Sequence, residues 1–529
     1  MERVLVVDAF GTGGKVRRLS RDVIGAGART VASVLEDEGY EVELVMYEMI
    51  TRSKSDFEPD VVCVGVMTGD ERAAKRVFRL YPEAMKVLGG PGAADPSALV
   101  KTGADAAIFG EAEETLPELL ETGEPVPGAF VRAEDGIEFP GPRPPVPKPP
   151  EVDPSFIRAY PHRWAARVYL EVVRGCSNSY RTTLELPDGR RCSGCGLCRE
   201  GEGVERWNCP EGIPPGCGFC SVPSLFGPAR SKDLGAIIEE ARGLVEHGVR
   251  RIVLSASDFL DYRRGEEPLT DPRNPPPNLE ALEALLRRVS RIVDVTFVEN
   301  VKACLVDEDV ARLLGEFCEG TSVSVGVETG DEGLLKAIGK PSTLGESLKA
   351  VELLSRAGLR PHVYFVYGLP GQTERTARAT IAAMRKAVEL GAEKVTVYRF
   401  RPLPASAFGD FPPGPGPRED PASRMIANEA KRLNRALKRR WVGRRVEAFV
   451  AEPSLDGRND AFAWPVKGGP KIRIKGGSEY LGTRAEVEVT GVVGDKVVTG
   501  KVRRVIEEVI RRDLINTSPC QPNPRVFRS

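Results

Sequence analysis

Apolar runs and amphipathic stretches alternate along the first part of the chain. The apolar runs are residues 3–7, 41–46, 61–66, 86–88 and 106–109. Helix-like periodicity lies between them, near residues 20–38, 71–82 and 112–121. Continuous apolar strands separated by helices are typical of a parallel sheet that helices cover on both faces. The pattern predicts a doubly wound, Rossmann-like α/β domain over residues 1–138.

The same alternation returns after residue 155. The candidate strands are residues 167–173, 249–254, 292–298, 321–327, 361–367 and 394–400. The helical patterns lie near residues 232–247, 278–290, 307–317, 343–357 and 374–390. This series predicts a partial (β/α)6 barrel over residues 155–405, with catalytic groups at the carboxyl ends of the strands.

Two proline-rich segments divide the chain, and we expect both to be extended linkers because proline is excluded from helix interiors and central strands. They are residues 139–154 and 406–421. A basic helical stretch, short strands and turns follow, which predicts a small β-barrel within residues 422–504. Residues 505–529 read as a tail.

The composition is that of a globular protein. Of the 529 residues, 41% are hydrophobic and 29% are charged, and the net charge is −1. This balance excludes wholesale disorder. The chain shows no signal-peptide pattern and no run of the roughly 18 apolar residues that a membrane-spanning helix needs. We therefore expect a cytoplasmic protein with no membrane partner.

Cysteine is the residue type with the clearest clustering. The chain has 11 cysteines but only 3 histidines, and seven of the cysteines fall between residues 176 and 220. In a long chain without a secretion signal, such a cluster indicates metal binding rather than disulfides. Thiolate sets favour iron–sulfur clusters or zinc.

Three of these cysteines are candidate ligands of one cluster. Cys176 ends the first predicted barrel strand, and Cys217 and Cys220 form a C-x2-C pair just before the first barrel helix. Three thiolates on a loop above the first strand suit a cubane cluster with one iron left open for a chelating ligand. A C-x2-C pair alone often binds zinc, but this placement is more specific.

These cysteines and their flanks resemble the radical SAM superfamily. The segments Ser324–Gly330 and Gly368–Gly371 resemble the fourth- and sixth-strand motifs of that family. The resemblance implies a [4Fe–4S] cluster and S-adenosylmethionine (SAM), which the cluster cleaves reductively to give a radical that abstracts hydrogen from an unactivated carbon. It also implies a one-electron donor such as ferredoxin or flavodoxin. The residues implied as cofactor contacts are Phe219, Asp258, Glu328, Gly368 and Pro370.

The spacing of the first two cysteines departs from the family pattern. Forty residues, Ser177 to Gly216, stand where the family has three. Cys209 is therefore an alternative first ligand, although we favour Cys176 because it ends the strand after Arg174 and Gly175.

The insertion, residues 177–216, carries its own thiolates. Their arrangement resembles a ferredoxin ligand run with a lengthened last gap. A second [4Fe–4S] cluster, a zinc ion and a single iron all fit four such ligands, and a purely structural knuckle is the simplest alternative. The four residues are Cys192, Cys195, Cys198 and Cys209.

The first domain resembles the cobalamin-binding domains that precede many radical SAM barrels. The turn that contains Gly90 and Gly92, followed by Phe109–Thr115, carries the resemblance and makes both glycines candidate cofactor contacts. The usual cobalt-ligating histidine is missing, since His162 is the first histidine in the chain. The three cysteines of N-terminal methylthiotransferase domains are also missing, because this block has only Cys63.

The last block is basic, with 19 Lys and Arg against 9 Asp and Glu over residues 422–504. Its order of basic helix and short strands resembles the TRAM domain of tRNA methylthiotransferases, and such a surface would bind RNA phosphates. The alternative is a solvated charged helix without nucleic acid. The candidate RNA-binding residues are Lys431, Arg435, Lys438, Arg439, Arg440, Arg444 and Arg458.

These features favour an RNA-modifying radical SAM enzyme that acts on tRNA by methyl or methylthio transfer. One alternative is a cobalamin-dependent methylase of a protein side chain, such as a glutamine of methyl-coenzyme M reductase. A further alternative is a non-catalytic iron–sulfur protein that binds RNA.

Overall fold

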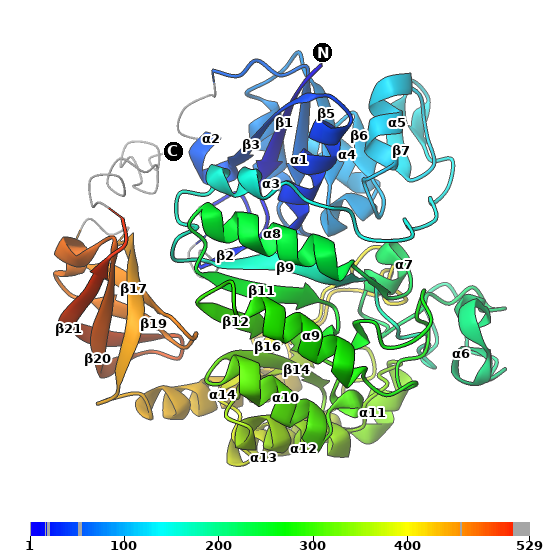
Figure 1. The fold of residues 1–529 in the computed structure, drawn as a ribbon. Helices are drawn as coiled ribbons and strands as arrows, with labels where there is room; N and C mark the ends of the chain where they lie inside the picture. Colours follow the sequence, from blue (N-terminus) through cyan, green and yellow to red (C-terminus); the bar gives the residue numbers. More distant parts are fainter. Residues whose placement is uncertain (1, 16, 18–21, 51–55, 455–457, 511–529) are drawn as a thin grey trace.

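A seven-stranded sheet with the order β3-β1-β4-β5-β6-β7-β8 forms the first part of the computed structural model (Figure 1). The structure describes residues 2–15, 17, 22–50, 56–454 and 458–510. The strands are β1 (Arg3–Asp8), β3 (Glu41–Met46), β4 (Val61–Gly65), β5 (Met85–Gly89), β6 (Ala106–Ile108), β7 (Ala129–Ala133) and β8 (Gly136–Glu138). The helices are α1 (Gly27–Asp37), α2 (Tyr47–Ile50), α3 (Glu71–Phe78), α4 (Ser97–Thr102) and α5 (Thr115–Thr122). The strands β3, β1, β4, β5 and β6 are parallel to one another, so the predicted doubly wound fold is confirmed.

Six parallel β/α units follow, as the sequence predicts. Their strands are β9 (Arg167–Arg174), β11 (Arg251–Ala256), β12 (Val295–Val298) with β13 (Asn300–Val301), β14 (Ser322–Glu328), β15 (Arg360–Tyr367) and β16 (Lys394–Arg399). Glu299 joins β12 to β13, because its amide donates to Leu254 and its carbonyl accepts from Ser324. Two short strands flank β9: β2 (Val23–Ile24), which is parallel to it, and β10 (Arg230–Ser231), which is antiparallel.

Helices cover the outer face of this partial barrel (Figure 1). They are α8 (Leu234–Glu246), α9 (Leu279–Val289), α10 (Glu308–Cys318), α11 (Glu332–Ala337), α12 (Leu344–Arg356) and α13 (Glu374–Glu389), and α6 (Leu197–Glu200) and α7 (Val222–Phe226) are short helices of the cysteine-rich region. Asp307 caps α10 with its side chain, and Thr343 and Glu346 form a capping box on α12. These caps satisfy amide groups that the first helical turn leaves unpaired.

Buried and partly exposed side chains alternate along the strands, and this alternation shows which face of the sheet lines the inside of the partial barrel. In β14, Val323, Val325 and Val327 are buried against the helices, and Ser322 and Ser324 point to the opposite face. Side chains of a strand alternate between its two faces, so the polar residues line the lumen of the barrel.

A closed five-stranded barrel ends the described chain, after the helix α14 (Pro421–Arg439). Its strands, in the order β17-β18-β19-β21-β20, are β17 (Arg445–Pro453), β18 (Ala461–Pro465), β19 (Lys471–Ile474), β20 (Thr483–Val493) and β21 (Val497–Glu508). The small β-barrel is confirmed, and its last strand runs past residue 504 into the expected tail. Most of that tail, residues 511–529, lies outside the described residues.

The C-terminal β-barrel packs on the partial β/α barrel, at the edge where the parallel strands of the β/α barrel begin. Arg251, the first residue of β11, donates from Nη1 to the Pro465 carbonyl at 3.0 Å and from Nη2 to Ala165. Arg360, the first residue of β15, donates to Gly468 at 2.9 Å. The cysteine-rich loop and α7 lie at the opposite edge (Figure 1).

The proline-rich segment 406–421 differs from its prediction. It is not a free linker, because Phe408 is wholly buried and its amide donates to Gly218 at 2.7 Å. Gly414 packs on Gly368, with 2.9 Å between the Gly414 Cα and the position of a Cβ on Gly368. The segment therefore folds over the cysteine loop, which the local proline content does not reveal.

Among the described residues, no helix combines the length and the apolar character that crossing a bilayer requires.

We expect the substitution Arg251→Met to lower the free energy of unfolding by about 2 kcal/mol, because it removes the donor to the Ala165 carbonyl and one of the two donors to the Pro465 carbonyl. The neighbouring Arg250 pairs with Glu507 at the surface, at 2.6 Å. The control Arg250→Met should therefore cost less than about 1 kcal/mol. Urea unfolding followed by tryptophan fluorescence measures both, since Trp164, Trp441 and Trp464 lie at this interface. Equal costs for the two variants would contradict the anchoring role of Arg251.

Candidate active site

A tight turn places the first cysteine of the candidate cluster at the carboxyl end of β9. Gly175 has φ 78°, and a Cβ there would overlap the carbonyl oxygen of Pro228. Only glycine fits both the backbone conformation and the close approach. The amide of Cys176 then donates to Gly227 at 3.1 Å, which fixes the cysteine beside the loop that precedes β10.

Asn178 brings Cys176 and Cys217 together across the insertion. Its backbone amide donates to the Cys176 sulfur and its Nδ2 to the Cys217 sulfur, each at 3.5 Å. Cys220 follows one turn later, since its amide donates to the Cys217 carbonyl at 2.8 Å. The structure thus gathers the three preferred cysteines, and Cys209 lies elsewhere, beside Arg181.

Burial and nearby cations act on these thiols in opposite directions. Burial raises the pKa of Cys176 to about 11 and that of Cys220 to about 12. The ammonium groups of Lys302, near Cys176, and Lys340, near Cys217, favour the thiolates. Without a metal the thiols are protonated at neutral pH, so metal binding must release protons.

The donor set of three thiolates fits an iron–sulfur cluster. A cubane cluster takes each thiolate at a separate corner. Three cysteines leave one corner without a protein ligand.

A buried charge network lies under Cys176. The Lys302 ammonium contacts Asp258 at 3.0 Å and Asp261 at 3.2 Å, and donates to the Ser177 hydroxyl at 2.6 Å. Burial alone would lower the pKa of Lys302, but the two carboxylates raise it. Asp258 also accepts from the amides of Leu260 and Lys302.

The carboxylate of Asp258 thus pairs with Lys302, and its contact with the cofactor stays a prediction. Sequence reasoning missed Lys302, Asp261 and Ser177. The one available signal was a lysine directly after a barrel strand, which is where catalytic groups of this fold lie.

Glu328 lies at the carboxyl end of β14 in a strained conformation. Its φ is 68°, and a register shift in the pairing with β15 precedes it. Its carboxylate pairs with Lys340 at 2.8 Å. A non-glycine residue in this region costs energy and is found mostly at functional sites. The strain turns the side chain toward the lysine that also faces Cys217.

The predicted contacts Phe219, Gly368 and Pro370 lie in the same region. Phe219 packs in the apolar cluster that contains Leu369 and Phe408. Gly368 has φ 75°, and its amide donates to the Gln372 side chain at 2.8 Å. Pro370 is half-buried. Segment 406–421 covers this cluster from outside.

Polar side chains line the lumen of the barrel. Ser255 donates to Glu299 at 2.8 Å, and burial raises the pKa of Glu299. Tyr364 contacts Ser324 at 3.4 Å and stacks on Tyr398, with 5.9 Å between ring centroids. Tyr364 thus faces the lumen. Its position in the sequence did not decide between the lumen and the outer face.

The carboxyl edges of the two α/β sheets face each other across a set of ion pairs. Arg174, the last residue of β9, pairs with Glu113 and lies 3.7 Å from Glu111, both just after β6. Glu111 also pairs with Arg230 at 2.6 Å. Ligands of doubly wound sheets bind at this edge. A ligand there would lie next to the cysteine loop.

Gly90 and Gly92 have a packing role in this structure. A Cβ on Gly90 would lie 2.8 Å from the Val66 oxygen, and one on Gly92 would lie 2.7 Å from the Met67 carbonyl carbon. The turn therefore packs closely on the end of β4. A Cβ on Gly11, after β1, or on Gly89, at the end of β5, would meet nothing within 4 Å.

Most of the predicted RNA-binding residues are exposed. Lys431, Arg435, Arg439, Arg440, Arg444 and Arg458 lie at the surface. Lys438 differs from the prediction, because only 5% of it is exposed and it faces the barrel beside Lys394. Burial lowers the pKa of Lys438 to about 8, so it belongs to the interior of the protein rather than to a phosphate-binding surface.

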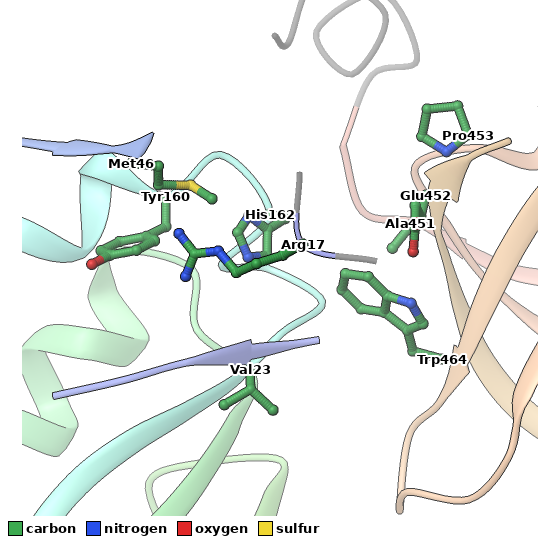
Figure 2. Close-up of a pocket in the computed structure, with 9 residues that line it drawn as sticks. All are labelled: Arg17, Val23, Met46, Tyr160, His162, Ala451, Glu452, Pro453 and Trp464. Carbon is green, nitrogen blue, oxygen red and sulfur yellow. The ribbon is translucent and has the colours of Figure 1, made fainter. Parts of the chain in front are cut away.

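Figure 2 shows a pocket between the first domain and the C-terminal barrel. Arg17, Tyr160 and His162 form one wall, and Glu452 and Trp464 the other. Arg17 pairs with Glu48 at 2.8 Å and with Asp8 at 3.4 Å. Its guanidinium is therefore already paired with two carboxylates of the protein, and no cysteine lines the pocket.

Comparisons with known proteins agree with this geometry. Residues 208–384 match the family model of the Radical SAM superfamily, and residues 16–120 match that of the B12 binding domain. An uncharacterized protein of Methanopyrus kandleri is 65% identical over 511 residues, which cover 96% of this chain and 97% of that one. An uncharacterized protein of Methanocaldococcus jannaschii is 37% identical over 513 residues, covering 94% and 98%.

More distant matches include enzymes whose names state an activity. Ribosomal protein uS12 methylthiotransferase RimO of Moorella thermoacetica is 26% identical over 307 residues, 56% of this chain and 66% of that protein. The structure of the radical SAM methyltransferase TsrM from Kitasatospora setae gives a TM-score of 0.53 at 18% identity, covering 77% of this chain and 75% of that one. The cobalamin-dependent radical enzyme OxsB gives 0.52 at 15% identity, covering 72% and 52%.

The chain is thus a radical SAM enzyme with a B12-binding domain. It belongs to the same family as the M. kandleri and M. jannaschii proteins, to which it is similar over nearly the whole of each chain. Membership of the superfamily implies a [4Fe–4S] cluster and SAM as cofactors.

We expect Gly218→Ala to destabilise the site by about 2 kcal/mol, because a Cβ there would overlap the Phe408 ring and overpacking has costs of this size. Phe408→Ala removes the obstacle, so Gly218→Ala should cost little in that background. A double-mutant cycle by thermal unfolding, with iron content measured in parallel, tests the contact. Additive effects would show that segment 406–421 does not close on the cysteine loop.

Proposed function

We propose that the protein is a cobalamin-binding radical SAM methyltransferase that modifies an unactivated carbon of RNA, with tRNA as the favoured substrate. The observation that carries this proposal is the apposition of two ligand-binding edges. Arg174 leads directly into Cys176 and pairs with Glu113 at the carboxyl edge of the B12-binding domain. A cobalamin at that edge would therefore adjoin the cluster and SAM.

Named residues of the chain would hold the cofactors. Cys176, Cys217 and Cys220 are the proposed cluster ligands, and Asn178 orients two of their sulfurs. Lys302 and Lys340 supply the positive charge that an anionic thiolate cluster needs. When bound, the cluster and SAM supply hydrogen abstraction and cobalamin supplies a methyl carrier.

The overall reaction balances with two molecules of SAM and two electrons. One SAM gives its methyl group to the substrate carbon and leaves as S-adenosylhomocysteine. The other takes the hydrogen atom from that carbon and leaves as 5′-deoxyadenosine and methionine. A low-potential protein such as ferredoxin or flavodoxin is the proposed electron donor.

The cysteine content of the first domain favours methyl over methylthio transfer. Cys63 is the one cysteine in residues 1–138, and it is buried in β4. Burial raises its pKa to about 12, so it is a core residue rather than a cluster ligand. Structural neighbours with cobalamin bound also support the methyl-transfer proposal.

The exposed face of α14 supports an RNA substrate. Lys431, Arg435, Arg439 and Arg440 form a cationic surface there. Related proteins whose names state a substrate act on ribosomal protein uS12 or on tRNA. Because α14 is remote from the cysteine loop, an RNA bound by this surface would have to span the β/α barrel, which favours a large folded substrate over a small one.

The test is anaerobic turnover of the full chain reconstituted with iron, sulfide and cobalamin. With SAM carrying a deuterated methyl group and bulk tRNA, we expect 5′-deoxyadenosine and S-adenosylhomocysteine in equal amounts and a trideuteromethyl group on a tRNA nucleoside. Cys217→Ser should abolish 5′-deoxyadenosine release. Label found only on added ribosomal protein would overturn the RNA assignment. Release of 5′-deoxyadenosine by a protein that binds no cobalamin would overturn methyl transfer.

Two adjacent residues of α14 test the RNA surface. Arg439→Met should weaken tRNA binding and reduce the slope of log K against log salt by about 1, because one phosphate contact is lost. Lys438→Met should leave tRNA affinity unchanged and raise the melting temperature, since it removes a buried charge that faces Lys394. Filter binding at several salt concentrations measures the first effect. Equal losses of affinity would contradict this assignment of faces.

A further inference from the structure

The cysteine-rich insertion, residues 177–216, is a long loop that begins and ends at the candidate cluster site. It leaves the barrel after Cys176 and returns at Gly216, whose amide donates to the Tyr180 carbonyl at 2.8 Å. Its helix α6 lies at the rim of the molecule (Figure 1). Cys195 is exposed, and Cys192, Cys198 and Cys209 are half-buried.

A buried arginine lies among the sulfurs of this insertion. Arg181 is 3% exposed, and its guanidinium donates to the carbonyls of Ile213 at 2.7 Å and Trp207 at 2.6 Å. Its electrostatic neighbours are Cys209, Cys198 and Cys195. Among the described residues, no carboxylate lies within ion-pair distance of it.

A buried cation without an anionic partner is costly. Four thiolates around a [4Fe–4S] core form a centre with net negative charge, which would compensate the guanidinium. The run C-x2-C-x2-C followed by Cys209-Pro210 resembles the bacterial ferredoxin run C-x2-C-x2-C-x3-C-P, with the last gap lengthened from three residues to ten.

We propose that Cys192, Cys195, Cys198 and Cys209 bind a second [4Fe–4S] cluster, that Arg181 is its counter-cation, and that this cluster passes electrons to the catalytic one. The role in electron transfer rests on the proposed function.

The path between the two cysteine sets is short. Ser179 donates to the Cys198 carbonyl at 2.8 Å, and the adjacent Asn178 contacts the sulfurs of Cys176 and Cys217. Ser179 is three residues from Cys176, so their Cα atoms are at most about 11 Å apart. Exposed Cys195 makes the insertion the outer end of this path. One electron at a time enters from a reduced ferredoxin or flavodoxin and leaves to the catalytic cluster.

The first experiment counts iron and records electron paramagnetic resonance spectra of the reconstituted full chain. The wild type should hold about eight iron and Cys198→Ser about four, since each cubane holds four. The cluster retained by Cys198→Ser should still respond spectroscopically to added SAM, which also shows that the catalytic site is folded. Cys217→Ser should lose that response. Unchanged iron in Cys198→Ser, or zinc in the insertion, would overturn the proposal.

The second experiment separates electron relay from catalysis. Cys198→Ser should lose 5′-deoxyadenosine formation driven by reduced ferredoxin or flavodoxin but keep it with titanium(III) citrate, which reduces the catalytic cluster directly. Equal turnover with both reductants would overturn the relay. Loss with both reductants in the wild type would instead contradict the proposed function.

Arg181 has its own test. Arg181→Met should make the second cluster harder to reduce, because removal of a buried cation disfavours the added electron, and Arg181→Lys should restore part of the effect. Arg191→Met is the matched control, since Arg191 lies in the same insertion but is exposed and pairs with Glu185. A redox titration followed by electron paramagnetic resonance measures the shift. The same potential in Arg181→Met and Arg191→Met would overturn the counter-cation role.

Discussion

The buried pairing of Arg174 with glutamates of the first domain is the interaction on which the rest of the structure depends. Burial alone would lower the pKa of Arg174, but Glu171 and Glu113 hold it well above its ordinary value. A charged group removed from water needs such partners. Glu171 lies on the same strand as Arg174, whereas Glu113 belongs to the first domain, so separating the domains would remove Glu113 and leave Glu171 as the remaining partner. The pairing therefore fixes the B12-binding edge against the loop that begins at Cys176. Glu111, which also pairs with Arg230, ties that edge to the strand after the cysteine loop.

Buried positive charge recurs wherever cysteines gather. Lys302 lies near Cys176, Lys340 near Cys217, and Arg181 near Cys209. Two of these cations have carboxylate partners, Asp258 with Asp261 for Lys302 and Glu328 for Lys340. Arg181 is the exception among the three. The same electrostatic logic thus supports one cluster at the family site and a second in the insertion.

The sequence interpretation was strongest where chemistry is carried by local patterns. The order of strands and helices, the grouping of Cys176 with the C-x2-C pair and the final small barrel all agree with the structure. It was weaker for Lys438, because the pattern of basic residues along a helix does not show which of them the neighbouring strands bury. Segment 406–421 looked like a linker, since proline content reports local stiffness and not what the chain folds against.

The sequence by itself determined the fold class, the radical SAM motifs and the presence of two cysteine sets, because strand periodicity and ligand spacing are properties of neighbouring residues. Tertiary structure decided what these parts do together. Only the folded chain apposes the carboxyl edges of two sheets, strains Glu328 toward Lys340 and encloses Arg181 among thiols. These are contacts between residues far apart in the chain, whose distances and burial depend on how the domains pack.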